Sequence, residues 1–356
     1  MMVTSTSSSS RPRRLGVVVA LLIFISGSVS GWTMSALRKG RLNRPTAVSR
    51  GFDEKYGTVN NSTIPTGDEV ASLFGVQRFT RVPNLVWKFV WRTHGRLLPL
   101  LHLRDRAKPK DADQSLKVMW NKAIAALDVN SPTFDAGWTY DFLPSSTRWI
   151  LKYIPTRLFP RLHHANIEIR TAYLNQAIQQ EIGHLSTNTK VRIIALGSGY
   201  DSRYTRLLTT DVVQDAWELD IASVLASKKR MVERLQERRA NVKVPHSRAI
   251  DLNDVASVKA TLQEILNTQK TDDESWHTIF VSEAVFIYLD EGIPIELMKT
   301  CRNVYAPDSS FCFADLLRDI PSGDRDLAER EVAKAGWKLV DWQPKPGLAR
   351  HMGVCR

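Results

Sequence analysis

The stretch VRIIALGSGYDSRYTRLL, residues 191–208, is the most informative part of this chain about its fold. Its apolar beginning predicts a buried strand, which ends at Gly197-Ser198-Gly199 before the chain turns polar at Asp201. Glycines at such a turn allow backbone conformations that a side chain would forbid, and they let the backbone come close to a ligand. A helix that follows would point its N-terminus at the same place. The stretch therefore predicts a strand, a tight turn and a helix arranged around a ligand.

The sequence around this stretch alternates between two patterns. Strand-like runs occur at 191–196, 215–219, 277–282 and 309–314, and helix-like stretches between them read ASVLASKKRMVERLQERR, DVASVKATLQEILNTQ and EGIPIELMKTCRNVY. Alternating strands and helices predict an α/β fold, with a doubly wound and mostly parallel sheet that is covered on both faces. Ligands of such sheets bind beyond the carboxyl ends of the strands, at the topological switch point. The glycine turn lies at such an end.

The glycine turn is not a dinucleotide fingerprint, because Ser202 occupies the position of the third glycine in GxGxxG. A phosphate loop is also absent, since no GK[ST] follows. These departures argue against a nicotinamide-dependent dehydrogenase. They favour a nucleoside-like ligand that has no pyrophosphate, although a GxG turn can also serve packing alone.

Carboxylates follow the next two predicted strands. Asp220 ends DAWELD, 21 residues after Gly199, where a carboxylate can bind both hydroxyls of a ribose. Asp251 and Leu252 lie in RAIDLND, where an acid can accept a hydrogen bond from an adenine amino group and an apolar neighbour can pack on the ring. Either acid can instead cap the helix that follows it.

Glu283 interrupts the apolar run TIFVSEAVFIYL. A carboxylate in such a run is costly to bury unless a positive charge meets it. A cationic ligand would provide that charge. The sequence does not assign a catalytic residue.

In their order along the chain, the segments ANIEIRTAYLNQAI, IIALGSGYDSRYTRLL, WELD, DL and VSEAVFIYL resemble the leucine carboxyl methyltransferase family of S-adenosylmethionine-dependent enzymes. The resemblance covers residues 165–318 well and 72–164 loosely. It implies a Rossmann-like class I methyltransferase sheet with a helical N-terminal cap, and S-adenosylmethionine as the cofactor.

The resemblance implies that seven residues bind the cofactor: Arg170 at the methionine carboxylate, Gly197 and Gly199 along the methionine and ribose, Asp220 at the ribose hydroxyls, Asp251 and Leu252 at the adenine, and Glu283 at the methionine amino group. Without the resemblance, Arg170 would be interpreted as a solvated helix arginine. Ser198 stands where the family often has alanine. A lysine that some members use from the N-terminal part has no assigned position in this sequence.

These features predict an O-methyltransferase that acts on a carboxylate or hydroxyl of a small molecule. One alternative keeps the chemistry but methylates the C-terminal leucine carboxylate of a protein, and another is a non-catalytic cofactor-binding module at a membrane. A carboxylate acceptor needs no base because it is already ionised, whereas a hydroxyl acceptor needs a base or a lowered pKa.

The net charge of +12 belongs mostly to the beginning of this 356-residue chain. Without the eight basic residues before Asp53, 41 basic residues remain against 37 acidic ones, an excess of +4. The sequence therefore does not indicate a nucleic-acid partner for the folded part. The cysteines Cys301, Cys312 and Cys355 form no CxxC pair and no ligand spacing, so we expect no metal site and no disulfide framework.

The chain is expected to have four parts: a basic leader at 1–52, a linker at 53–71, a helical cap that shapes the substrate pocket at 72–165 and the methyltransferase domain at 166–356. Within the leader, residues 15–32 carry no charge and would form a helix of about 27 Å, near the lower limit for crossing a bilayer. We expect a single-pass N-terminal membrane anchor. A cleaved signal and an organelle transit peptide remain alternatives, and the topology is open.

Overall fold

The computed structural model describes residues 161–268, 275–318, 320, 323–344 and 351–356, together with 115, 118–120, 122–123, 135, 137–145 and 147–149. For 161–166 and 168 it describes the backbone alone. The predicted leader, its segment 15–32, the linker and most of the predicted cap lie outside the described residues. Within the described part, no helix is both long and apolar enough to cross a membrane.

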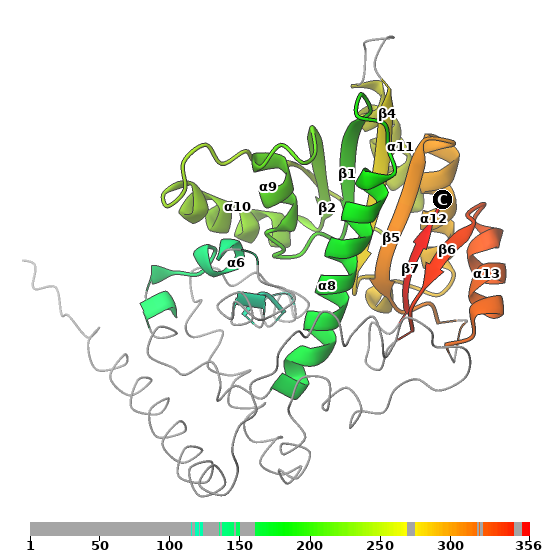
Figure 1. Ribbon diagram of the computed structural model, residues 1–356, viewed down its shortest axis with the longest axis horizontal. Helices are drawn as coiled ribbons and strands as arrows, with labels where there is room; N and C mark the ends of the chain where they lie inside the picture. The colour runs from blue at the N-terminus through cyan, green and yellow to red at the C-terminus, as the bar shows by residue number, and fades with distance from the viewer. Residues whose placement is uncertain are drawn as a thin grey trace, which may run out of the picture.

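A seven-stranded sheet forms the centre of the molecule (Figure 1). Its strand order is β3-β2-β1-β4-β5-β7-β6. The strands are β1 (Lys190–Leu196), β2 (Asp215–Asp220), β3 (His246–Ala249), β4 (Trp276–Glu283), β5 (Ser309–Asp315), β6 (Leu339–Trp342) and β7 (His351–Cys355). The first five strands are parallel to one another, and β7 is antiparallel to both β5 and β6. The predicted α/β fold with a mostly parallel sheet is confirmed.

Strand β1 is the topological switch point, because the chain leaves it toward β2 on one side and later returns to it with β4 on the other. Residues Arg192–Leu196 pair with β2, and the whole strand pairs with β4 from Lys190 to Leu196. A ligand of such a sheet binds outside the carboxyl ends of the strands that meet at this point. The glycine turn that follows β1 is therefore in the expected place.

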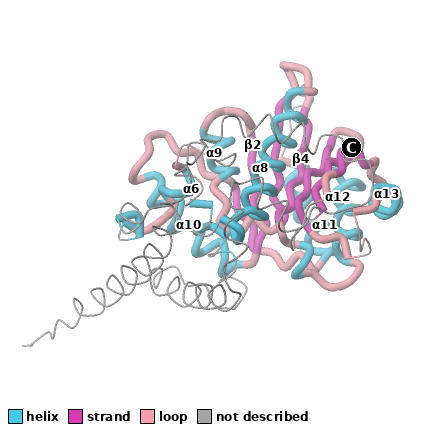
Figure 2. The backbone as a smooth tube through the Cα atoms, turned by 60° about the horizontal axis from the view of Figure 1, so that its bottom comes forward, coloured by secondary structure: helices cyan, strands magenta, loops and turns pink. Residues whose placement is uncertain are grey.

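Helices cover both faces of the sheet (Figure 2). They are α6 (Trp138–Asp141), α8 (Arg161–Gly183), α9 (Arg203–Thr209), α10 (Ala222–Gln236), α11 (Val255–Asn267), the 3-10 helix η2 (Phe286–Tyr288), α12 (Ile293–Tyr305) and α13 (Arg325–Lys334). One core joins the sheet to α11, α12 and α13, and a second joins its other face to α8 and α9. Within β1, Ile193 faces the second core and Ile194 faces the first. This alternation explains why the strand reads as continuously apolar.

A third apolar cluster joins the described cap residues to α10 and to the glycine turn. Trp120 and Trp138 pack there with Met231 of α10 and with Tyr200, which follows Gly199. The described part of the cap therefore rests on the same end of the sheet as the predicted ligand site.

Several predicted boundaries differ from the structure. The C-terminal strands β6 and β7 were not predicted as strands. Helix α12 begins at Ile293 and not at Glu291, because Gly292 has a φ of 79° and Pro294 occupies the first turn. Helix α8 begins at Arg161, inside the region that was assigned to the cap. The three cysteines are free and buried.

Candidate functional site

The glycine turn needs glycine at its first position for two reasons. Gly197 has a φ of 67°, which side chains disfavour, and a Cβ there would lie 2.5 Å from Cγ2 of Val285. Gly199 also has a positive φ, of 49°. The turn after β1 thus packs directly against the loop after β4, which carries Val285. The two strand ends that form the switch point are in contact here.

Asp220 binds the glycine turn from the end of β2. Its Oδ2 accepts a hydrogen bond of 2.7 Å from the Gly199 N–H, and its Oδ1 accepts one of 2.7 Å from the Ile221 N–H. Burial raises the pKa of this carboxyl group, and the two N–H groups oppose the rise. Helix α10 is not capped by Asp220, because its N-cap residue is Ile221 and no side chain caps it. The structure therefore brings the predicted ribose carboxylate to the glycine turn.

Glu283 ends β4 in a cluster of positive charges. Its carboxylate oxygens lie 2.9 Å from Lys122 Nζ, 3.0 Å from Arg170 Nε and 2.9 Å from a terminal nitrogen of Arg203. All four side chains are at least 93% buried. The positive charge that a buried Glu283 requires is thus supplied by the chain itself, and not by a ligand alone as the sequence suggested.

Asp201 extends this cluster at the N-terminus of α9. It lies 3.0 Å from Lys122 Nζ and 3.5 Å from Arg203, and its Oδ1 accepts from the Arg203 N–H at 2.9 Å. The Arg203 guanidinium is also anchored to α8, because its Nε donates to Asn175 Oδ1 at 2.8 Å. Arg203 therefore ties together α8, the glycine turn and the end of β4.

The cluster holds both carboxylates in their ionised form. Burial alone would raise the pKa of Glu283, but Lys122, Arg203 and Arg170 outweigh it and lower this pKa to about 2. Burial also acts to raise the pKa of Asp201, and Arg203 and Lys122 lower it well below its ordinary value. Three cations then face two carboxylates, so this buried group of described side chains has one positive charge in excess.

The third predicted contact region is arranged differently. Asp251 is exposed and its Oδ1 accepts from the backbone N–H of Asn253 at 2.9 Å, which closes a turn. Helix α11 is capped by Asp254 and not by Asp251. Leu252 is buried in the core on the α11 side of the sheet. The Ile250 N–H donates to the Asp220 carbonyl at 2.9 Å, so this loop adjoins the end of β2. The adenine contacts of Asp251 and Leu252 remain predictions.

Asp315, the last residue of β5, stabilises the end of β4. This fully buried carboxylate accepts from Ser282 Oγ at 2.8 Å, from the Val285 N–H at 2.7 Å and from the Leu316 N–H at 2.9 Å. Between these donors, Ala284 has a φ of 56°, which a residue with a Cβ rarely adopts. Asp315 therefore holds the loop that places Glu283 and Val285.

Sequence reasoning missed Lys122, Asp201, Arg203 and Asp315 as site residues. Asp201 and Arg203 lie within the stretch 191–208, but nothing in a single sequence indicates that they face Glu283. Lys122 belongs to the cap, and only the folded chain brings it to β4. The family resemblance includes a lysine from the N-terminal part, but no local pattern distinguishes Lys122 from the other lysines there.

Ser202, which replaces the third glycine, joins the cap to the turn. Its Oγ lies 2.8 Å from Thr139 Oγ1, and Thr139 donates to Asp135 Oδ2 through its hydroxyl at 2.7 Å. A glycine at this position would lack the hydroxyl that makes this contact. The substitution that excludes a dinucleotide fingerprint thus has a structural use here.

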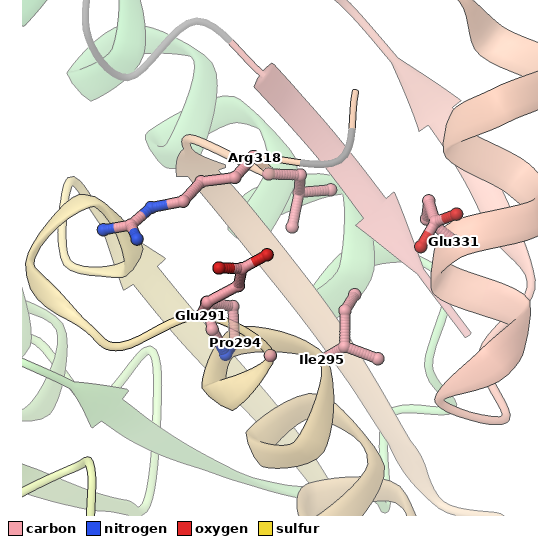
Figure 3. Close-up of a pocket in the computed structure, with 7 residues that line it drawn as sticks. Glu291, Pro294, Ile295, Arg318 and Glu331 are labelled. Carbon is pink, nitrogen blue, oxygen red and sulfur yellow. The ribbon is translucent and has the colours of Figure 1, made fainter. Parts of the chain in front are cut away.

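A separate pocket opens beside the loops that follow β4 and β5 (Figure 3). It is lined by Glu291, Gly292, Pro294, Ile295, Leu317, Arg318 and Glu331. None of the seven predicted cofactor contacts lines it. Within the described residues, no group of three or more His, Cys, Asp or Glu side chains is placed to hold a metal ion.

Comparison with known structures finds methyltransferases at low similarity. Two structures of magnesium protoporphyrin IX methyltransferase from Synechocystis PCC 6803 match: one with bound S-adenosylhomocysteine (TM-score 0.36, 10% identity, 54% of this chain and 85% of that one) and one with bound S-adenosylmethionine (0.37, 11%, 66% and 95%). An rRNA methyltransferase from Streptomyces viridochromogenes matches with a TM-score of 0.32 and 12% identity over 53% of this chain and 84% of that one.

None of the curated proteins compared with the chain matches it. The family model described as leucine carboxyl methyltransferase matches residues 117–301, which is just over half of the chain. This match includes Lys122, the glycine turn and Glu283. The chain therefore belongs to the leucine carboxyl methyltransferase family, and the protein is an S-adenosylmethionine-dependent methyltransferase.

Proposed function

We propose that this protein transfers the methyl group of S-adenosylmethionine to an oxygen of a small molecule, either a carboxylate or a hydroxyl. The observation that carries this proposal is the buried cluster at the ends of β1 and β4, in which three cations face two carboxylates. Buried cations and carboxylates are costly unless opposite charges meet them. The amino-acid part of S-adenosylmethionine is a zwitterion, so its carboxylate can pair with a cation of the cluster and its ammonium with a carboxylate.

Arg170 fits the role of the residue that binds this carboxylate. Among the described residues, it hydrogen-bonds only through Nε, to Glu283. Its two terminal nitrogens are therefore available for a charge-assisted and bidentate contact. The buried position of Arg170 excludes the interpretation as a solvated helix arginine.

Asp220 fits the role of the residue that binds the ribose. Each of its oxygens accepts one hydrogen bond from the backbone, and a carboxylate can accept about four in all. Two acceptor positions thus remain for two hydroxyl groups. The glycines at 197 and 199 keep the backbone free of side chains beside it.

S-adenosylmethionine supplies, when bound, an electrophilic methyl group on a positively charged sulfur. The chain contributes binding, orientation and exclusion of water, and alignment of reacting groups contributes several kcal/mol to lowering a barrier, roughly 7 or more in favourable cases. A carboxylate acceptor would need only this alignment. The described site residues are accordingly assigned to binding, and none is assigned as a base.

The cap supports a small acceptor over a protein acceptor. Met119, Trp120 and Trp138 pack on Tyr200 beside the glycine turn, and the contact between Thr139 and Ser202 closes the same side. Aromatic and apolar side chains beside the glycine turn favour a small acceptor with an apolar part. The C-terminal carboxylate of a protein remains the second candidate, because a flexible tail also presents a free carboxylate.

The acceptor class is tested by following a labelled methyl group. The purified protein is incubated with methyl-labelled S-adenosylmethionine and a cell extract, and protein is then separated from small molecules. We expect label in the small-molecule fraction, and we expect Asp220→Ala to abolish it because the ribose contact is lost. Asp211→Ala removes an exposed carboxylate on the α9–β2 turn and serves as the matched control. Label found only in protein would replace the proposal with the protein acceptor, and no transfer to either fraction would contradict both.

A further inference from the structure

The acceptor positions of Glu283 are all engaged by side chains of the chain. Lys122 Nζ, Arg170 Nε and Arg203 donate to its oxygens at 2.9 to 3.0 Å, and Thr171 Oγ1 donates at 3.3 Å. A carboxylate has about four lone-pair positions. An ammonium group from the methyl donor can therefore reach Glu283 only if one of these four donors leaves.

Lys122 is the donor that can leave Glu283 with the smallest loss of other contacts. Arg203 is held by Asn175 as well as by Glu283, and Arg170 is fixed within α8, which packs on β4 and β5. Lys122 has a second carboxylate partner, Asp201, at 3.0 Å, so it keeps a charged contact after leaving Glu283. It is also an ammonium, the same chemical group that would replace it. Among the four donors, Lys122 alone comes from the cap.

We infer that the Lys122 ammonium occupies the place on Glu283 that the ammonium of the methyl donor takes, and that Asp201 is the positioning residue that retains Lys122 at the site after this exchange. The inference rests on the proposed function, because it takes Glu283 as the partner of the donor's amino group. The Lys122 side chain must then move when a ligand with an ammonium binds and need not move when the ammonium is missing, and amide exchange around Lys122 is the reporter of this movement.

Hydrogen exchange on the full chain tests this coupling. The two probes are S-adenosylhomocysteine, which carries the amino-acid part, and 5′-methylthioadenosine, which keeps the adenosine and the sulfur but lacks that part. Both are used at concentrations that calorimetry shows to be saturating. We expect S-adenosylhomocysteine to change amide exchange in residues 115–123, and we expect 5′-methylthioadenosine to change exchange only near the glycine turn and the end of β2.

Two substitutions test whether Asp201 positions Lys122 or only supports the fold. Asp201→Asn keeps Oδ1 as an acceptor for the Arg203 N–H but removes the charge that retains Lys122. We expect this substitution to weaken the binding of S-adenosylhomocysteine at least about tenfold, because a buried charge loses its partner. We expect the affinity for 5′-methylthioadenosine to stay within about twofold of that of the unmodified protein. Lys122→Met should abolish the ligand-dependent change in exchange of residues 115–123. The control is Asp211→Asn, which removes the charge of an exposed carboxylate paired with Lys243 and should leave the binding of both probes unchanged.

The outcomes distinguish a failure of the proposed function from a failure of the exchange at Glu283. If neither probe binds the unmodified protein, the proposed function fails and the inference fails with it. If both bind but change residues 115–123 alike, or if Asp201→Asn weakens both equally, the exchange at Glu283 is wrong while the proposed function stands. A change that is specific to S-adenosylhomocysteine and is lost in Lys122→Met supports the exchange.

Discussion

Glu283 is the residue on which the site depends electrostatically, and its ionisation connects the site to the stability of the fold. Because its folded pKa of about 2 lies below the ordinary value of 4.5, its contribution to the free energy of unfolding is fully present above pH 4.5 and is lost as the pH falls toward 2. Replacing it by glutamine removes this titration and leaves three buried cations with less negative charge.

The substitution Glu283→Gln gives a pH-dependent prediction. We expect the variant to be less stable than the unmodified protein at pH 7, and we expect the difference to shrink between pH 4.5 and about 2, where the unmodified Glu283 becomes neutral as well. Urea unfolding of both proteins at a series of pH values measures this. A difference that stays constant down to pH 2.5 would contradict the assigned pKa.

At the residue scale, site residues that directly follow a strand could be predicted from the sequence. Site residues that come from a distant segment of the chain could not. Glycines at 197 and 199 and an acid at 220 follow directly from strand ends, and the structure joins them through the hydrogen bond from Gly199 to Asp220. Lys122 reaches Glu283 across 161 residues of chain, and no local pattern encodes that contact. Asp251 follows a strand too, but its side chain closes its own turn.

At the scale of elements, the parallel strands β1, β4 and β5 were predictable because most of their residues are buried on both faces and they therefore contain apolar runs. Strand β3 is short and all four of its residues are exposed, so no apolar run marks it in the sequence. Strands β6 and β7 escaped prediction because no helix separates them, which removes the alternation that revealed the others. Strand β7 also contains Gly353, a residue that strand patterns disfavour.

Gly353 allows three strands to approach one another closely. A Cβ at this position would lie 2.6 Å from Phe313 of β5 and 3.1 Å from the Asp341 carbonyl of β6. We expect Gly353→Ala to lower the free energy of unfolding by about 1–3 kcal/mol through overpacking, as measured by urea denaturation. Gly183→Ala, at the end of α8 where a Cβ would meet nothing within 4 Å, is the control and should leave stability unchanged or slightly higher. Equal stability of the two variants would refute the packing argument.

At the scale of the whole molecule, the excess of positive charge lies outside the residues that the structure describes. The leader at 1–52 and the cap boundaries therefore remain predictions, as does the division into four parts. Composition alone suggested that the leader and not the folded domain carries the charge. It could not indicate whether the leader is retained.

We propose that residues 15–32 anchor the full chain in a membrane, because they carry no charge and follow three arginines. Alkaline carbonate extraction of membranes tests this proposal. We expect the full-length protein to stay in the pellet and a variant lacking residues 1–52 to appear in the supernatant. Mass determination of the retained protein distinguishes an anchor from a cleaved signal or a transit peptide, since either of the latter would shorten the chain.

The position of β1 between β2 and β4 affects how the protein is made. Trp276, the first residue of β4, is translated 80 residues after Leu196, the last residue of β1. Until then, one edge of a strand with two apolar faces has no neighbour on the ribosome-bound chain. An open and apolar strand edge pairs readily with other chains. This interval of synthesis is therefore one in which we expect the nascent protein to be exposed to aggregation.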